Sequence, residues 1–252
     1  MIIYIPTKGR GPHRQHTYEA LVKAGVTDKY PVWLLVADEE EYEQFSRAKM
    51  PVTIHHYGPG IRASRQFVLD SAPDKVLMLD DDLNNWAERV ETGGMVKFFR
   101  DDTAPLFAVR KIEALLDTYT HAAIGHRQMA NTQPLVNIGG RALRALAYRA
   151  DIVRELGLRY ELPVMEDFEM TLKLLTRGHP NAIFYGVVQD QKGSDMPGGC
   201  QGLRTLELHN ECAMALAAMF PDYVKLKEVG GWDLGTRLDV TVQWKKALKH
   251  GN

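Results

Sequence analysis

Cysteine is scarce in this sequence, which contains only Cys200 and Cys212 among its 252 residues. Their spacing fits neither a paired zinc knuckle nor the dense cysteine framework of a small secreted domain. We therefore expect a protein of a reducing compartment that folds around a hydrophobic core. With 45% hydrophobic and 25% charged residues, the chain has enough apolar side chains for the core of one large α/β domain.

Long apolar segments and a strong charge imbalance are also missing. The N-terminus has only five residues before Pro6 and no basic stretch, which is too little for a signal peptide or a membrane span. The formal net charge of −1 gives no overall attraction to nucleic acids or anionic lipids. We expect a soluble, cytoplasmic protein that does not contact a membrane.

A polyanionic partner would therefore need a local basic patch, and the sequence offers two candidates. Lys245, Lys246 and Lys249 gather at the C-terminus. The other candidate is a stretch rich in arginine, made of Arg127, Arg141, Arg144, Arg149, Arg154 and Arg159. The alternative is that these residues only form solvated helix faces.

Short apolar runs alternate with amphipathic segments over the first eighty residues. The runs predict strands at 2–5, 32–36, 52–55 and 76–79, and the amphipathic segments predict helices at 15–23, 38–48 and 60–71. This alternation predicts an α/β fold with a mixed, mostly parallel sheet flanked by helices. Ligands of such sheets bind outside the carboxyl ends of the strands.

The pattern continues less regularly beyond residue 83. Residues 84–102 are expected to be irregular or a hairpin, and residues 193–200 a glycine-rich loop. We expect one domain over residues 1–220, with a C-terminal extension at 221–252 that packs on the same domain. Further helices are predicted at 105–120, 151–156, 166–175 and 205–220, and further strands at 121–126, 143–148 and 182–188.

Three consecutive aspartates, Asp80, Asp81 and Asp82, follow the apolar run at 76–79. Like charges so close together repel each other, and a divalent cation removes that cost. Alternate side chains of an extended segment point the same way, so Asp80 and Asp82 are the expected ligands of Mn²⁺ or Mg²⁺. The alternative is a capping cluster on a surface turn.

Four segments, in this order, resemble the landmarks of GT-A glycosyltransferases. They are Ile5-Pro6-Thr7-Lys8-Gly9-Arg10, Gly60-Ile61-Arg62-Ala63-Ser64-Arg65, the run from Val76 to Asp82, and Glu166-Asp167. The resemblance covers about residues 1–190. It implies the GT-A (Rossmann-like) fold of nucleotide-diphospho-sugar transferases, and a hexosyltransferase that uses a UDP-sugar and a divalent metal.

The resemblance also implies roles for individual residues of the donor site. Thr7, Lys8, Arg10 and Asp38 would contact the nucleotide base and ribose, and Asp81 the ribose or sugar. Arg62 and Arg65 would face the diphosphate, for which guanidinium groups are well suited. Both arginines can alternatively be ordinary residues of a helix surface.

The later landmarks concern catalysis and closure of the site. Asp167, with Glu166 second, would be the general base that deprotonates the acceptor hydroxyl, although carboxylates at a helix start also favour the helix dipole. His209 is a candidate third metal ligand, or simply a structural histidine. Gly198, Gly199 and Arg204 belong to a segment suited either to closing over phosphate or to a surface turn.

The Pro-Gly-Gly-Cys stretch at 197–200 and the Arg-Thr-Leu-Glu-Leu-His-Asn stretch at 204–210 are similar to the TET/JBP-associated glycosyltransferases of phages and some eukaryotes. Membership would imply that a sugar is attached to a hydroxymethylated pyrimidine, such as hydroxymethylcytosine, in DNA. A phage protein would work in the host cytoplasm. Alternatives are a glycan, lipid or protein hydroxyl as acceptor, a nucleotidyltransferase, or a catalytically silent binding module.

Overall fold

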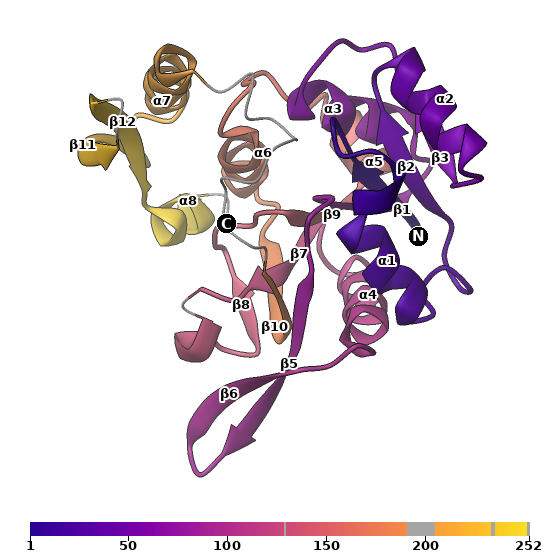
Figure 1. Ribbon diagram of the computed structural model, residues 1–252. Coiled ribbons are helices and arrows are strands. Elements are labelled where there is room, and N and C mark those ends of the chain that lie inside the picture. The colour runs from indigo at the N-terminus through magenta and orange to yellow at the C-terminus, as the bar shows by residue number, and fades with distance from the viewer. Residues whose placement is uncertain (129, 191–204, 233–234, 251–252) are drawn as a thin grey trace.

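The computed structural model describes residues 1–128, 130–190, 205–232 and 235–250. A ten-stranded sheet runs through it in the order β3-β2-β1-β4-β9-β7-β10-β5-β6, with β8 paired to β10 (Figure 1). The strands are β1 (Ile2–Pro6), β2 (Val32–Val36), β3 (Val52–Ile54), β4 (Lys75–Leu79), β5 (Asn85–Thr92), β6 (Met95–Arg100), β7 (His121–His126), β8 (Val136–Ile138), β9 (Ala145–Arg149) and β10 (Asn181–Asp190).

The first four strands are parallel, with β1 between β2 and β4. Strand β9 runs antiparallel to both of its neighbours, β4 and β7, so the sheet is mixed. The predicted α/β architecture, a mixed sheet flanked by helices, is confirmed. Strands β5 and β6 form a hairpin that projects from the molecule (Figure 1), one of the two possibilities expected for this segment.

Helices cover both faces of the sheet because consecutive side chains of a strand point to opposite sides. Ile3 and Ile5 of β1 pack in one core cluster with α1, α2 and α4, whereas Tyr4 packs in another with α3, α5 and α6. The helices are α1 (His16–Lys23), α2 (Glu39–Arg47), α3 (Ile61–Ser71), α4 (Ala104–Leu115), α5 (Ala150–Glu155) and α6 (Glu166–Leu175), with the short 3₁₀ helices η1 (Pro12–Arg14) and η2 (Ala130–Thr132).

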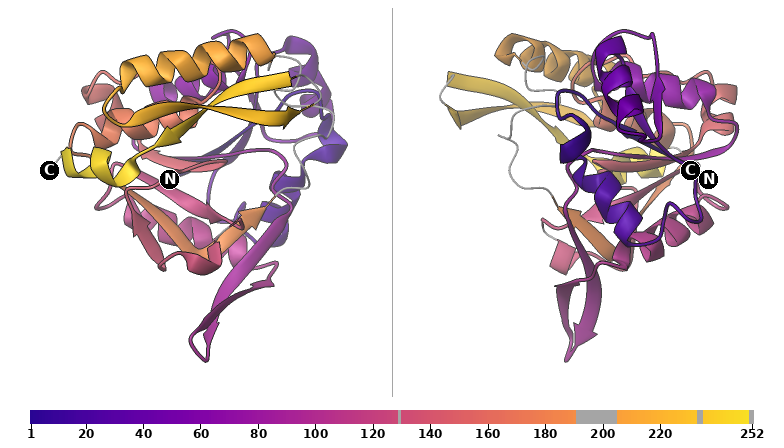
Figure 2. Two further views of the ribbon diagram at one scale, coloured as in Figure 1. Left: turned by 90° about the vertical axis from the view of Figure 1, so that its left-hand side faces the viewer. Right: turned by 45° about the vertical axis from the view of Figure 1, so that its right-hand side comes forward.

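The C-terminal elements include the helix predicted at 205–220 and, beyond residue 220, regular structure where the sequence suggested only an extension. They comprise α7 (Leu206–Met219), the hairpin of β11 (Val224–Trp232) and β12 (Gly235–Val242), and α8 (Trp244–His250). Figure 2 shows the hairpin lying alongside α7. A third core cluster joins these elements to the outer side of α6, through residues such as Leu172, Leu216 and Ala247. Helix α6 is therefore buried on two sides.

Buried charges of α6 pair with one another and with nearby backbone groups. The carboxylate of Glu169 accepts hydrogen bonds from the backbone nitrogens of Glu161 and Leu162, at 3.0 and 2.8 Å, and from Lys173. Such pairing offsets part of the cost of removing these groups from water. No helix among the described residues has the length and the apolar composition needed to cross a membrane.

His121 of β7 is a buried histidine that the fold keeps neutral. Its ring stacks on Tyr148 with 4.3 Å between the centroids, and its Nδ1 lies 2.9 Å from the carbonyl oxygen of Ala147. Burial lowers the pKa of His121 to about 4, and the positive charge of Arg65 acts in the same direction. The folded protein therefore binds fewer protons at this site than the unfolded chain between about pH 4 and pH 6.5.

Acidification is therefore expected to destabilise the protein. As the pH falls below about 6.5 the unfolded chain gains a proton on His121 that the folded protein rejects, which removes about 2 kcal/mol of stability by about pH 5. Urea unfolding at these two pH values measures the difference. The His121→Gln variant should show a smaller difference than wild type, whereas His16→Gln, at an exposed histidine, should not. Equal pH dependence in all three proteins would contradict the assignment.

Candidate active site

The three aspartates lie at the carboxyl end of β4, where the chain turns into β5. Their backbone is fixed by contacts from distant segments. The amide of Asp80 donates to the carbonyl of Arg144 at 2.9 Å, and the hydroxyl of Thr17 in α1 binds the carbonyl of Asp80 and accepts from the amide of Leu83. Because a strand follows the triplet, the interpretation as a helix-capping cluster is wrong.

Asp81 is the buried member of the triplet. Thr7, in the loop after the adjacent strand β1, donates its hydroxyl to the Asp81 carboxylate at 2.8 Å, and Arg10 Nε lies 3.0 Å from the other carboxylate oxygen. Burial raises the pKa of Asp81 to about 7, although Arg10 and Thr7 oppose the shift. The structure thus brings together three residues that were expected to contact the nucleotide, and their mutual contacts shape the wall of the site.

Asp80 and Asp82 keep part of their carboxylate surface exposed, 31% and 20% of the side chain respectively. Two accessible carboxylates at one strand end are a suitable donor set for Mn²⁺ or Mg²⁺, which complete their coordination with water and phosphate oxygens. Within the described ranges no three His, Cys, Asp or Glu side chains are grouped as a metal site. His209, in the first turn of α7, is therefore not assembled with the aspartates as a third ligand in this structure.

Arg65 joins the triplet to the start of α6. Its Nη1 lies 2.6 Å from the carboxylate of Glu166 and its Nη2 lies 3.3 Å from that of Asp80. The Arg65 side chain is 5% exposed, so its interpretation as an ordinary residue of a helix surface is wrong. Burial by itself would lower the pKa of this guanidinium, but the carboxylates of Glu166 and Asp80 outweigh burial and raise it, so Arg65 carries its positive charge at every relevant pH.

The first two residues of α6 have different environments. Glu166 is buried and bound to Arg65, so its carboxylate is committed to an ion pair. The Asp167 side chain is 13% exposed, and its nearest basic partner is Arg141 at 3.5 Å, at the limit of a hydrogen bond. Of the two carboxylates, Asp167 is the one available to accept a proton from another molecule.

The remaining donor-site candidates lie farther out on the surface. Lys8 is exposed. Asp38 caps α2 by accepting from the backbone nitrogens of Glu40 and Glu41. Arg62 is exposed and donates to the carbonyl of Glu161, 3.3 Å away, instead of sharing the buried position of Arg65. Gly198, Gly199 and Arg204 fall outside the residues that the structure describes.

Sequence reasoning overlooked two residues that support the triplet. Gln15 donates to the hydroxyl of Thr7 at 3.0 Å and to the carbonyl of Gly11, and Thr17 makes the backbone contacts described above. Neither has a sequence signal, because the Gln15 contacts depend on how the loop after β1 folds and the Thr17 contacts depend on how α1 meets the end of β4. Among the described residues the buried atoms Gln15 Oε1, Arg65 Nε and Asn84 Oδ1 lack hydrogen-bond partners. Unsatisfied polar atoms around a strand end fit a site that is completed by a ligand.

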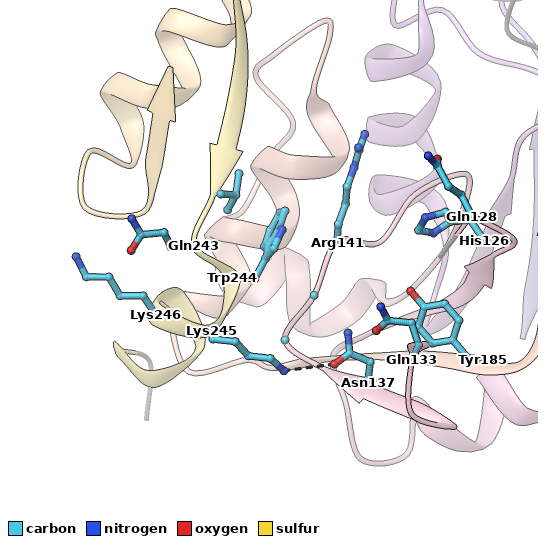
Figure 3. Close-up of a pocket in the computed structure, with 13 residues that line it drawn as sticks. His126, Gln128, Gln133, Asn137, Arg141, Tyr185, Gln243, Trp244, Lys245 and Lys246 are labelled. Carbon is cyan, nitrogen blue, oxygen red and sulfur yellow. Dashed lines mark hydrogen bonds between the residues drawn. The ribbon is translucent and has the colours of Figure 1, made fainter. Parts of the chain in front are cut away.

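A cavity of about 680 Å³ lies next to Arg141 (Figure 3). This size is typical of a small-molecule or nucleotide site. Its walls come from β7, β8, β10, the glycine turn after β8 and the start of α8. The lining residues are His126, Gln128, Gln133, Asn137, Gly139, Gly140, Arg141, Tyr185, Val242, Gln243, Trp244, Lys245 and Lys246.

Solved structures with a similar fold include glucosyl-3-phosphoglycerate synthase from Mycobacterium tuberculosis. In complex with Mn²⁺, UDP and phosphoglyceric acid it has a TM-score of 0.54 and 13% identity over 95% of this chain and 85% of that chain. Its complex with Mn²⁺, UDP-glucose and phosphoglyceric acid has a TM-score of 0.54 and 13% identity, over 93% of this chain and 88% of that chain. A further mycobacterial protein has a TM-score of 0.55 and 10% identity, over 95% of this chain and 83% of that chain. The predicted GT-A fold is confirmed.

Sequence comparison gives a second, independent result. The family described as TET-Associated Glycosyltransferase matches residues 1–199, which include all of the ten-stranded sheet and the residues of the aspartate site. A comparison with curated proteins gave no match.

Proposed function

Because this chain belongs to the TET-associated glycosyltransferase family, we propose that it transfers a hexose from a UDP-sugar to 5-hydroxymethylcytosine, or a related hydroxymethylated pyrimidine, in DNA. The observation that carries the proposal is the Asp80–Arg65–Glu166 chain of contacts. These contacts hold the carboxyl end of β4, which is expected to bind the donor, against the start of α6, where Asp167 lies.

The donor end uses Asp80 and Asp82 as ligands of Mn²⁺ or Mg²⁺. The bound metal supplies Lewis-acid stabilisation of the leaving nucleoside diphosphate. In support, structures of glucosyl-3-phosphoglycerate synthase contain Mn²⁺ with UDP-glucose, or Mg²⁺ with UDP. Thr7 and Arg10 hold Asp81 in place beside the nucleotide, and the guanidinium of Arg65 keeps the site electrically balanced between two carboxylates.

The acceptor end uses Asp167 as general base. The acceptor oxygen attacks the anomeric carbon, the bond from that carbon to the diphosphate breaks, and Asp167 takes the hydroxyl proton. This displacement inverts the configuration of the sugar. Glu166 is a positioning residue because it acts through Arg65. A base within a duplex must leave the stack to reach such a site, so single-stranded or flipped substrate is expected.

The test combines the protein, Mn²⁺ and UDP-glucose or UDP-N-acetylglucosamine with a hydroxymethylcytosine oligonucleotide. We expect a hexose-sized mass gain on the modified base together with release of UDP, and neither with unmodified cytosine. Asp82→Asn should abolish both the mass gain and the release of UDP, because it removes a proposed metal ligand at the partly exposed end of the triplet.

Other outcomes of the same assay would contradict the proposal in different ways. Release of UDP without a mass gain on DNA would indicate a glycan, lipid or protein hydroxyl as acceptor. Pyrophosphate instead of UDP would indicate a nucleotidyltransferase. If the protein neither consumes any UDP-sugar nor binds UDP with Mn²⁺ in calorimetry, it is a silent binding module.

A further inference from the structure

The charges around the cavity differ from those of the chain as a whole. The chain carries 31 basic and 32 acidic residues, yet none of the described lining residues is acidic, and Arg141 and Lys245 are among them (Figure 3). Lys246 also lines the cavity, but its ammonium group donates to the carbonyl of Asp222 at 2.9 Å and points away from Arg141. The carboxylate next to Arg141, that of Asp167 at 3.5 Å, is not among the lining residues, and Lys245 has only uncharged oxygen partners, so the charge of the wall itself favours an anionic occupant.

His126, on the cavity wall, lies in the same positively charged surroundings. Burial lowers the pKa of His126, and Arg144 and Arg141 lower it further, whereas Asp190 has the opposite effect. Arg144 and Asp190 form an ion pair at 3.7 Å, so that carboxylate is already paired. Neutral His126 can therefore donate or accept a hydrogen bond without adding charge.

A series of planar groups connects the cavity to the candidate base. The guanidinium of Arg141 lies 4.0 Å from the ring centroid of Phe168, and that ring stacks on Trp244 with 5.7 Å between centroids. The same Arg141 lies 3.5 Å from the Asp167 carboxylate. An occupant that reaches Arg141 therefore lies beside the group that would deprotonate it.

The opposite wall is held by a contact between distant parts of the chain. Lys245, in the first turn of α8, donates to the carbonyl of Ile138 at 2.7 Å and to Asn137 Oδ1 at 3.3 Å (Figure 3). Carbonyl oxygens do not neutralise an ammonium group, so Lys245 keeps its positive charge at the rim. Trp244, which is partly buried, adds aromatic surface on which bases pack well, whereas the buried Tyr185 only lines the wall.

We propose that this cavity binds the strand of the acceptor DNA, with Arg141 and Lys245 holding backbone phosphates on either side of the nucleotide that is modified. The inference rests on the proposed function, since it names the surface that presents the acceptor to Asp167. It also explains how a chain of net charge −1 binds DNA: the positive charge is local and lies beside the catalytic group.

Two lysines on the same helix provide a matched test. Lys245 lines the cavity, whereas Lys249 is exposed on α8 and is not among the lining residues. Lys245→Glu and Lys249→Glu change the net charge equally. In fluorescence anisotropy with a labelled single-stranded hydroxymethylcytosine oligonucleotide, we expect Lys245→Glu to raise Kd roughly tenfold and to reduce the salt dependence by about one phosphate contact, and Lys249→Glu to change little.

A second variant and a second readout separate local binding from misfolding. Lys245→Gln removes the charge without reversing it and should give an intermediate Kd. UDP binding with Mn²⁺, measured by calorimetry, should be the same in all variants because the donor site lies at the aspartates. Equal Kd values for Lys245→Glu and Lys249→Glu, or competition by inorganic phosphate as effective as that of the oligonucleotide, would overturn the proposal.

Failure of this inference is distinguishable from failure of the proposed function. Glycosylated DNA with equal KM for the acceptor in both lysine variants would exclude the cavity while leaving the activity intact. Conversely, Lys245-dependent DNA binding without any sugar transfer would support the cavity and count against the proposed reaction.

Discussion

Asp167→Asn is expected to lower kcat for sugar transfer by about 10²–10⁴-fold, the usual contribution of a positioned general base. The amide is nearly the same size as the carboxylate, so the packing of α6 should persist. The amide cannot accept the proton of the acceptor hydroxyl. Initial rates with saturating UDP-sugar and oligonucleotide would measure the effect, and calorimetry should show unchanged binding of UDP with Mn²⁺.

The chain contains a control for this substitution. Asp151 is the second residue of α5, as Asp167 is of α6, and each contacts an arginine. If Asp167 served only the helix dipole, both Asp→Asn changes would cost a few tenths of a kcal/mol in stability and neither would affect kcat. A normal kcat in Asp167→Asn would remove Asp167 from the mechanism.

Arg65→Met is expected to lower the free energy of unfolding by about 3–5 kcal/mol. The substitution leaves the buried Glu166 carboxylate without its guanidinium partner, and it deprives Asp80 of the same partner. Methionine fills much of the volume of the arginine stem, so the loss of stability would come mainly from the missing charge and less from altered packing. Urea unfolding followed by tryptophan fluorescence would measure it.

Arg62→Met is the matched control for Arg65→Met. Arg62 lies on the same helix but is exposed, so its replacement should change stability by less than about 0.5 kcal/mol. If Arg65→Met does not fold, Arg65→Lys retains the charge with fewer hydrogen bonds and should be destabilised less. Equal stabilities of the Arg62 and Arg65 variants would contradict the buried network.

The position of Arg65 also bears on how the two halves of the site work together. One guanidinium contacts Asp80, which we propose lies on the donor side, and Glu166, the neighbour of Asp167, the proposed base. A shift of the aspartates when the metal and nucleotide bind would therefore reach α6 through a single buried side chain. This arrangement can align the base with the sugar without direct contact between Asp167 and the aspartates.

The sequence by itself determined the features that depend on local pattern. Apolar runs placed β1, β2, β3 and β4, because strand and helix periodicities are written in neighbouring residues. The same reasoning placed the aspartates at the end of β4 and started α6 at Glu166. Motif resemblance then indicated the GT-A fold, which the similar solved structures confirm, and the family, which the match over residues 1–199 confirms.

Only the tertiary structure decided which of these residues meet. Arg65 contacts Glu166 across 101 residues of sequence, Thr17 reaches Asp80 across 63, and Lys245 reaches Ile138 across 107. No local pattern encodes such pairs, because they follow from how helices pack on the sheet. The same packing buries Arg65 but leaves Arg62 exposed. It also brings Arg141 and Lys245 to the wall of one cavity, whereas the sequence places them in two separate basic patches.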